Sequence, residues 1–264
     1  MGRIQDCFQS LKKEGKAAFI PYLCAGDPDV STCLRLSRIL IEDGIDILEV
    51  GVPFTDPLAD GLTNQLAAQR ALEAGASQAS TFEMVKTLRK ESETPVVFYT
   101  YYNLVHARGV KRYIEDCAEA GVDGLLVLDL PPEEADELIE AARERDIEVI
   151  FIIAPTTREE RIVAITQKAS GFLYYVSREG VTGERQDLAE GLEGSLNTIR
   201  EHTDLPVVVG FGISSPEQVK TIGQLADGVV VGSTLVRCIQ ENLDDVEKAV
   251  QAYRERAQWL MGGF

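Results

Sequence analysis

Short apolar runs alternate with longer amphipathic segments along the whole chain. There are eight such runs, and most are rich in Val, Ile, Leu, Phe or Tyr without strict alternation of polar and apolar positions. Strands that are buried on both faces have this pattern. The runs lie at 17–25, 45–52, 95–102, 124–130, 148–154, 171–177, 206–212 and 227–233.

Helical patterns separate these predicted strands. Several segments space their apolar residues three and four apart, or open with a capping residue, a proline or acids and so resemble a first helical turn. Ser215, followed by a proline, is a predicted N-cap. The segments with these features are 31–44, roughly 62–74 and 78–92, 110–121, 131–146, 215–227 and 243–260, and the N-terminal 1–19 is also amphipathic.

Eight buried strands alternating with helices indicate a parallel sheet. Eight such units in about 250 residues are typical of a (β/α)8 TIM barrel. We expect one barrel domain over 1–264, with an extra N-terminal helix and additional helices after strands two and eight. A doubly wound open sheet is the alternative, but its dinucleotide-binding members carry a glycine-rich turn where this chain has "CAGDPD".

Charge and cysteine content narrow the class of protein. The chain has 26 Lys and Arg against 43 Asp and Glu, a net charge of −17, which opposes binding to nucleic acid or to anionic membranes. Its five cysteines form no C-x-x-C pair, as expected for reduced, packed thiols. No signal peptide or membrane span is apparent. We therefore expect a cytoplasmic protein, or a plastid stromal one if the source is a plant.

Acids near the end of the second predicted strand are the first candidates for chemistry, because TIM-barrel active sites lie at the carboxyl ends of the strands. Glu49 ends a buried strand, so we expect a raised pKa and a role as acid and base near neutral pH. Asp60, on the following loop, is expected to stay ionised. The alternatives are a buried ion pair for Glu49 and a loop or helix-capping role for Asp60. For Asp129, which follows strand four, the alternative is a cap on the predicted helix that begins with "PPEEAD".

Glycines near the last strands indicate a phosphate site. Gly210 and Gly212 follow strand seven, while Gly232 and Ser233 follow strand eight and open a short helix. TIM barrels often bind phosphate there with backbone N–H groups and a helix N-terminus. Gly183, after strand six, is a third side of the same site, and tight turns are the alternative explanation for all these glycines.

Residue types that are scarce exclude other chemistry. The two histidines are His106, predicted in the loop after strand three, and His202, near a helix end, so we expect no metal site. None of the lysines falls at the carboxyl end of a predicted strand, which argues against a Schiff-base aldolase. Carboxylates and tyrosines remain for proton transfer.

Five segments in order along the chain resemble the tryptophan synthase α subunit family. They are "FIPYLCAGDPD", "LEVGVPFTDPLADG", "YYVSREGVTG", "GFGISSPEQV" and "GVVVGS". The resemblance implies a (β/α)8 barrel that cleaves indole-3-glycerol phosphate to indole and glyceraldehyde 3-phosphate. It also implies no cofactor in this chain and an α2β2 complex with a β subunit that carries pyridoxal phosphate (PLP).

The resemblance also assigns roles to individual residues. It implies Glu49 and Asp60 as the catalytic pair, and a closing loop over 178–190. Tyr22 stands where phenylalanine is common, and Thr55 and Leu62 where serine and proline are usual. The implied substrate contacts are Tyr22, Tyr101, Asp129, Tyr174, Arg178 and Thr182; the phosphate contacts are Gly183, Gly212, Gly232 and Ser233; the partner interface is Pro53, Asp56 and Asn103.

Two other functions remain as alternatives at this point. One is a weakly active subunit whose main role is to bind and activate a β subunit. The other is a different phosphate-binding barrel lyase or isomerase.

Overall fold

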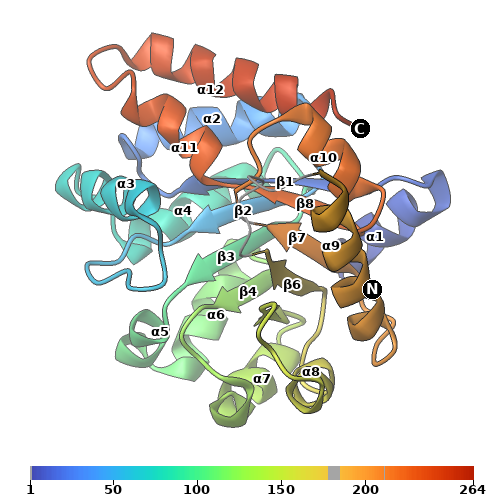
Figure 1. The fold of residues 1–264 in the computed structure, drawn as a ribbon. Coiled ribbons are helices and arrows are strands. Elements are labelled where there is room, and N and C mark those ends of the chain that lie inside the picture. Colours follow the sequence, from blue (N-terminus) through green and yellow to red (C-terminus); the bar gives the residue numbers. More distant parts are fainter. Residues whose placement is uncertain (1, 178–184, 211) are drawn as a thin grey trace.

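The computed structural model describes residues 2–177, 185–210 and 212–264, with side chains at 185–190 left aside. Within them, eight parallel strands close into a barrel in chain order, with β8 returning to β1 (Figure 1). The TIM-barrel prediction is confirmed, and the open sheet is excluded. The strands are β1 (Ala18–Cys24), β2 (Leu48–Gly51), β3 (Val96–Thr100), β4 (Gly124–Val127), β5 (Glu148–Ile153), β6 (Leu173–Val176), β7 (Val207–Gly210) and β8 (Gly228–Val231).

Helices surround this barrel, and the extra ones lie where they were predicted (Figure 1). An additional helix, α1, precedes β1, two helices follow β2, and two follow β8. The helices are α1 (Arg3–Glu14), α2 (Val30–Glu42), α3 (Leu62–Glu73), α4 (Gln78–Arg89), α5 (Tyr102–Arg108), α6 (Val110–Ala120), α7 (Asp136–Arg143), α8 (Glu159–Thr166), α9 (Arg185–Arg200), α10 (Pro216–Gly223), α11 (Ser233–Gln240) and α12 (Val246–Met261). None of those described is both long and apolar enough to cross a membrane.

Three local predictions need correction. His106 lies on α5 rather than in a loop. That helix starts where the backbone N–H of Tyr102 donates to Asp129 Oδ1 (2.6 Å), a partner from the turn after β4 that the local sequence does not reveal. The segment 131–146 divides into a 3-10 turn, Pro132–Glu134, and α7. The expected loop over 178–190 is too long, because α9 begins at Arg185.

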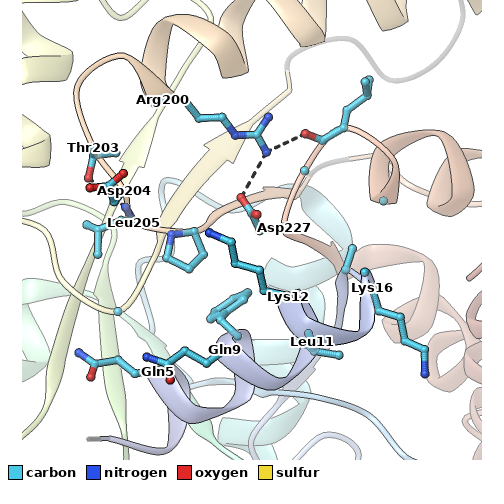
Figure 2. Close-up of a pocket in the computed structure, with 18 of the residues that line it drawn as sticks. Gln5, Gln9, Leu11, Lys12, Lys16, Arg200, Thr203, Asp204, Leu205 and Asp227 are labelled. Carbon is cyan, nitrogen blue, oxygen red and sulfur yellow. Dashed lines mark hydrogen bonds and ion pairs between the residues drawn. The ribbon is translucent and has the colours of Figure 1, made fainter.

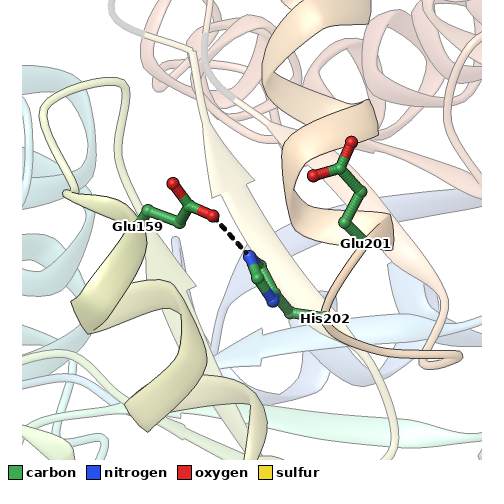
Figure 3. A group of neighbouring side chains, drawn as sticks. All are labelled: Glu159, Glu201 and His202. Carbon is green, nitrogen blue, oxygen red and sulfur yellow. Dashed lines mark hydrogen bonds and ion pairs between the residues drawn. The ribbon is translucent and has the colours of Figure 1, made fainter.

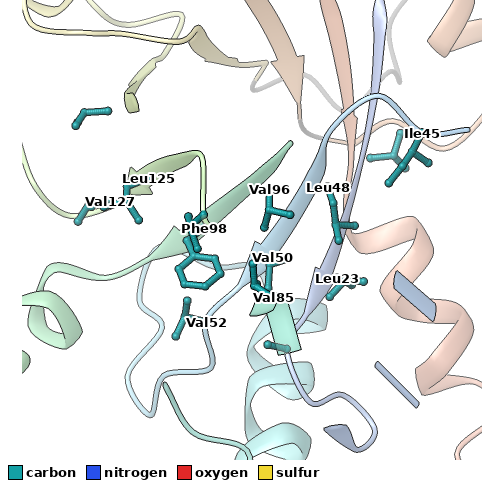
Figure 4. Packing of buried hydrophobic residues seen from close by; sticks show 14 of the residues in the cluster. Leu23, Ile45, Leu48, Val50, Val52, Val85, Val96, Phe98, Leu125 and Val127 are labelled. Atoms are coloured by element: carbon teal, nitrogen blue, oxygen red, sulfur yellow. The ribbon is translucent and has the colours of Figure 1, made fainter. Parts of the chain in front are cut away.

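Alternation along the strands decides which side chains face the barrel interior. In β2, Leu48 and Val50 pack outward against the helices, in the layer that Figure 4 shows. Ile47 instead belongs to the interior cluster. Successive strand residues point to opposite faces, so Glu49 shares the interior face with Ile47.

The amino end of the barrel is closed by α1. Ile4, Phe8 and Leu11 from this helix belong to the same buried cluster as the interior strand residues. The rings of Phe8 and Phe172, the residue before β6, lie 5.7 Å apart. With that end filled by apolar side chains, the carboxyl ends of the strands are where the interior opens.

Candidate active site

A cavity of about 300 Å³ lies at the carboxyl ends of the strands. That volume falls at the lower end of the range for small-molecule sites. Seven of the predicted site residues line it, and they lie in or just after five of the eight strands, β1, β2, β6, β7 and β8. They are Tyr22, Glu49, Asp60, Tyr174, Gly212, Gly232 and Ser233.

The Glu49 side chain is buried without compensation by any described residue. Its exposed fraction is 2%. Among the described residues, no hydrogen bond or ion pair involves its carboxyl group, so the predicted alternative of a structural ion pair finds no support there. Burial, with a further contribution from the negative charge of Asp60, raises the pKa of Glu49 from 4.5 to about 8. A carboxyl group with that pKa can both give and take a proton near neutral pH.

Asp60 has a different environment from Glu49. Tyr101 Oη donates to its Oδ2 (2.6 Å), Tyr99 Oη to its Oδ1 (2.8 Å), and Asn64 Nδ2 approaches Oδ1 at 3.4 Å. Burial raises the pKa of Asp60, and the three hydrogen bonds oppose that rise. Asp60 is thus a partly buried loop acid, and these donors stabilise its charged form, so the prediction that it stays ionised remains a prediction.

Tyr22 and Tyr174 both line the cavity, and each lies against a glycine of the neighbouring strand. A Cβ on Gly51 would lie 2.3 Å from Tyr22 Oη, and one on Gly210 would lie 2.2 Å from Tyr174 Oη. Each tyrosine hydroxyl therefore occupies the space that a side chain would fill if the facing glycine were any other residue. The sequence placed Gly210 beside the phosphate site, whereas the structure gives it this packing role.

Another side of the cavity is formed by Gly212, Gly232 and Ser233. Gly212 has a φ of +73°, a conformation that favours glycine. Gly232 is the N-cap of α11 and offers no side chain to the N–H groups of the first turn, which begins with Ser233. A helix N-terminus with these properties can bind an anion such as phosphate.

Other predicted contacts lie elsewhere. Tyr101 is buried behind Asp60 and does not line the cavity. Asp129 lines a separate hollow between β4 and β5. Its carboxylate accepts a hydrogen bond at the start of α5, so it caps that helix and not the predicted helix over 131–146. Arg178, Thr182 and Gly183 fall outside the described residues.

The predicted partner-interface residues belong to the acidic loop after β2 and to α5. Asp56 and Asn103 are exposed, whereas Pro53 is buried within the chain. Two leucines that follow Asp56 along the chain are among the most exposed large apolar residues described, Leu58 at 90% and Leu62, the first residue of α3, at 70%.

Sequence reasoning missed residues that contact the catalytic acids or the cavity. Tyr99 lines the cavity and donates to Asp60, but the sequence does not distinguish it from the other polar residues near the end of this strand, Tyr101, Tyr102 and Asn103. Asn64 lies in the first turn of α3, and its Oδ1 is buried without a hydrogen-bond partner among the described residues. An apolar wall completes the cavity, with Leu128, Ile152, Val176, Ile213 and Val230. For the four of these that share the interior cluster, only alternation with a known interior face selects the positions; Ile213 lies in the connection after β7.

A larger cavity, about 780 Å³, lies at the opposite end of the barrel (Figure 2). It is bounded by α1, by the end of α9 near Arg200, and by the segments that precede β7 and β8, including Asp204 and Asp227. None of the predicted site residues belongs to it. In TIM barrels the chemistry lies at the carboxyl ends of the strands, so the smaller cavity is the candidate active site.

One described group of side chains has metal-ligand chemistry, Glu159, Glu201 and His202 (Figure 3). Their possible ligand atoms lie within 4.8 Å of one another, and His202 Nε2 is 3.2 Å from Glu159 Oε1. Both glutamates are exposed, and none of the three lines the candidate active site. The prediction that catalysis uses no metal remains a prediction.

Comparisons with known proteins agree on one family. The family model described as "Tryptophan synthase alpha chain" matches residues 8–262. The tryptophan synthase alpha chain of Opitutus terrae is 57% identical, with 100% of this chain and 99% of that protein covered. The corresponding chain of Gluconobacter oxydans is 46% identical, with 98% of each covered.

Solved structures give the same result. The α subunit from Legionella pneumophila superposes with a TM-score of 0.92 at 34% identity, covering 100% of this chain and 98% of that one. A chain of ligand-free tryptophan synthase from M. tuberculosis gives a TM-score of 0.88 at 34% identity, covering 100% and 99%. The chain therefore belongs to the tryptophan synthase alpha chain family and is a lyase of tryptophan biosynthesis.

Proposed function

We propose that this chain cleaves indole-3-glycerol phosphate to indole and glyceraldehyde 3-phosphate, with Glu49 and Asp60 as the catalytic pair. One observation carries the proposal: two carboxyl groups face one cavity, and only one of them has hydrogen-bond donors from the described residues. Environments that differ in this way support separate roles in proton transfer.

Glu49 acts as the proton shuttle in this proposal. Protonated at neutral pH, it donates its proton to the ring carbon that bears the glycerol chain, leaving a positive iminium at the ring nitrogen. The Glu49 carboxylate then takes the proton of the hydroxyl on the adjoining carbon. The carbon–carbon bond breaks, its electron pair restores the indole ring, and the hydroxyl carbon becomes the aldehyde. Glu49 ends protonated as it began.

Asp60 stabilises the charge that develops during that sequence. Its ionised carboxylate accepts the N–H of the indole ring and offsets the positive iminium charge. The apolar wall of the cavity, with Leu128 and Ile152, accommodates the ring. At the other side, the backbone around Gly212, Gly232 and Ser233 holds the phosphate, so that binding energy remote from the reacting bond positions it.

A β subunit is the partner that we propose, in an α2β2 complex whose PLP belongs to that subunit alone. The solved relatives include structures titled tryptophan synthase from M. tuberculosis. An exposed apolar side chain, Leu58, next to the charged Asp56 and near α5 with Asn103, supports an interface on this face. We also propose a cytoplasmic location, or the plastid stroma for a plant source.

The test is an indole assay with purified chain and indole-3-glycerol phosphate, alone and with a β subunit. We expect indole in both cases, and Glu49→Gln to bind substrate while losing about 10²–10⁴-fold in turnover. Near wild-type turnover by this variant contradicts the proton shuttle. If no indole forms in either case but the chain still activates the β subunit, its role is activation alone. Turnover of another sugar phosphate would indicate a different lyase or isomerase.

A further inference from the structure

Two tyrosines near the end of β3 reach the two oxygens of one carboxylate. Tyr99 Oη donates to Asp60 Oδ1 and Tyr101 Oη donates to Asp60 Oδ2. Tyr101 continues the extended backbone beyond the strand, with φ −112° and ψ 145°. Residues two apart in extended chain share a face, which is why both hydroxyls meet the same group.

The two tyrosines differ in what else they contact. Tyr101 is 4% exposed, its ring lies 5.2 Å from that of Phe54, and its hydroxyl accepts the backbone N–H of Ala59 (3.1 Å). Both neighbours belong to the loop that carries Asp60, so Tyr101 holds that loop in place. Tyr99 instead lines the cavity, with its ring 5.3 Å from that of Tyr22.

The charges around Asp60 make these donors important. Among the described residues that line the cavity, none is a lysine or arginine. The acidic neighbour Glu49 supplies no positive charge to offset that of Asp60. The titratable groups that interact with Asp60 are Tyr22 and Cys24 from β1, Glu49 from β2, Tyr99 and Tyr101 from the end of β3, and Tyr174 from β6.

We propose that Tyr99 is a positioning residue for the lyase reaction, whose hydroxyl keeps Asp60 ionised and holds its Oδ1 at the cavity. This inference rests on the proposed function. Burial keeps the pKa of Tyr99 well above its usual value of 10, so the hydroxyl retains its proton and acts as a donor. A donor fixed in the cavity wall can stabilise the charged carboxylate without a cation.

Removing this donor alters the pH dependence of the reaction. In Tyr99→Phe the pKa of Asp60 rises, so the acidic limb of the pH profile of kcat/KM moves upward by about one pH unit. An ionised Asp60 also favours the protonated form of Glu49. Asp60 is ionised in both proteins at the pH of the basic limb, so that limb stays in place and the active pH range narrows from the acidic side. The two limbs describe the coupled pair rather than either residue alone.

The experiment compares wild type, Tyr99→Phe and the control Tyr113→Phe. Tyr113 Oη is 3.4 Å from Thr100 Oγ1 in the outer core, so the control also removes a buried hydroxyl from a tyrosine, but one that points away from the cavity. The pH profile of kcat/KM and circular dichroism are recorded for each protein. We expect a narrowed profile for Tyr99→Phe only, with folding unchanged in both variants. Wild-type limbs in Tyr99→Phe overturn the proposal.

A second measurement does not depend on turnover. The carboxyl carbon of Asp60 is titrated by ¹³C NMR in protein with labelled aspartate, and Asp60→Asn assigns the signal. We expect its midpoint to lie about one pH unit higher in Tyr99→Phe than in wild type or Tyr113→Phe. An equal midpoint in all three proteins contradicts the inference. If wild type forms no indole while the midpoint shifts, the proposed function fails and the role of Tyr99 stands.

Discussion

Buried acids lie at both ends of this barrel, and their surroundings are opposite. Before β4, at the amino end, Asp123 is 7% exposed and accepts hydrogen bonds from Arg3, Arg89 and the backbone N–H of Val96. At the carboxyl end Glu49 is 2% exposed, and none of the described residues donates to it. One end therefore uses a carboxylate to hold the fold together, and the other keeps a carboxyl group available for reaction.

The arrangement at the amino end repeats four times around the barrel. In each odd–even strand pair, a polar residue just before the even strand donates its N–H to a carbonyl at the start of the odd strand. In return, a side-chain oxygen of the polar residue accepts the backbone N–H of the odd-strand residue whose carbonyl it has bonded. We call this reciprocal pair of bonds a clasp. The four clasps are Asp46 with Phe19, Asp123 with Val96, Ser170 with Val149, and Asp227 with Val207.

The clasps explain how the opposite end can tolerate an uncompensated acid. They fix the strand starts in register, and α1 fills the interior behind them. The stability of the barrel is therefore concentrated away from the cavity. Three experiments probe this division, from the largest expected effect to the smallest.

Glu49→Gln should stabilise the protein at alkaline pH. The folded carboxyl group has a pKa of about 8 against 4.5 when unperturbed, so between these values the folded state holds a proton that the unfolded state has lost. Wild-type stability therefore falls as pH rises through this range, by up to about 1.4 kcal/mol per pH unit, and the amide removes that loss.

Urea unfolding of both proteins at several pH values between 4.5 and 8 measures the difference. Changing the exposed Glu137 on α7 to Gln is the control and should leave the wild-type pH dependence in place. A constant difference between Glu49→Gln and wild type across that range would mean that Glu49 is ionised in the folded protein.

Asp123→Ala should destabilise the protein by about 3 kcal/mol without changing the turnover of folded molecules. The substitution leaves the mostly buried guanidinium of Arg89 unpaired and the N–H of Val96 without an acceptor. Urea unfolding and the indole assay measure the two effects. Asp136→Ala, which breaks an ion pair with Lys168 at the surface, should cost no more than about 1 kcal/mol. Equal losses of unfolding free energy in the two variants would mean that the buried contacts of Asp123 stabilise the protein no more than a surface ion pair does.

Asp46→Ser should cost less stability than Asp46→Ala, by about 1 kcal/mol. A hydroxyl already serves as acceptor in the equivalent clasp, where Ser170 Oγ accepts the N–H of Val149 (2.8 Å). The melting temperatures of the two variants give the comparison. Equal melting temperatures would mean that the side-chain acceptor before β2 does not stabilise the protein, although its geometry repeats that of the other three clasps.

Much of the fold was predictable because it depends on periodicity. Two-faced apolar runs and the amphipathic segments between them indicated the barrel and its extra helices. Ser215 was correctly predicted as a cap, since it accepts the N–H of Gln218 within its own helix turn. Where a helix depends on a partner from elsewhere in the chain, as α5 does on Asp129, local pattern was insufficient.

The site was only partly predictable for the same reason. Glu49 and Asp60 could be selected as acids at the end of a buried strand and on its loop. That Asp60 is held by Tyr99 and Tyr101 depends on β3 lying next to β2, which closes a separation of about forty residues. Interior and exterior strand positions are also equally apolar in a two-faced run, so the cavity wall could not be selected by residue type.

The sequence by itself determined the barrel, the family and the acids that the chemistry needs, because these follow from local pattern and from residue types at strand ends. Tertiary structure alone decided their electrostatics. Burial and the nearby charge of Asp60 raise the pKa of Glu49, and hydroxyls from β3 and just beyond it stabilise Asp60. A pKa depends on how much water and which donors surround a group, and only the closed barrel brings those surroundings together.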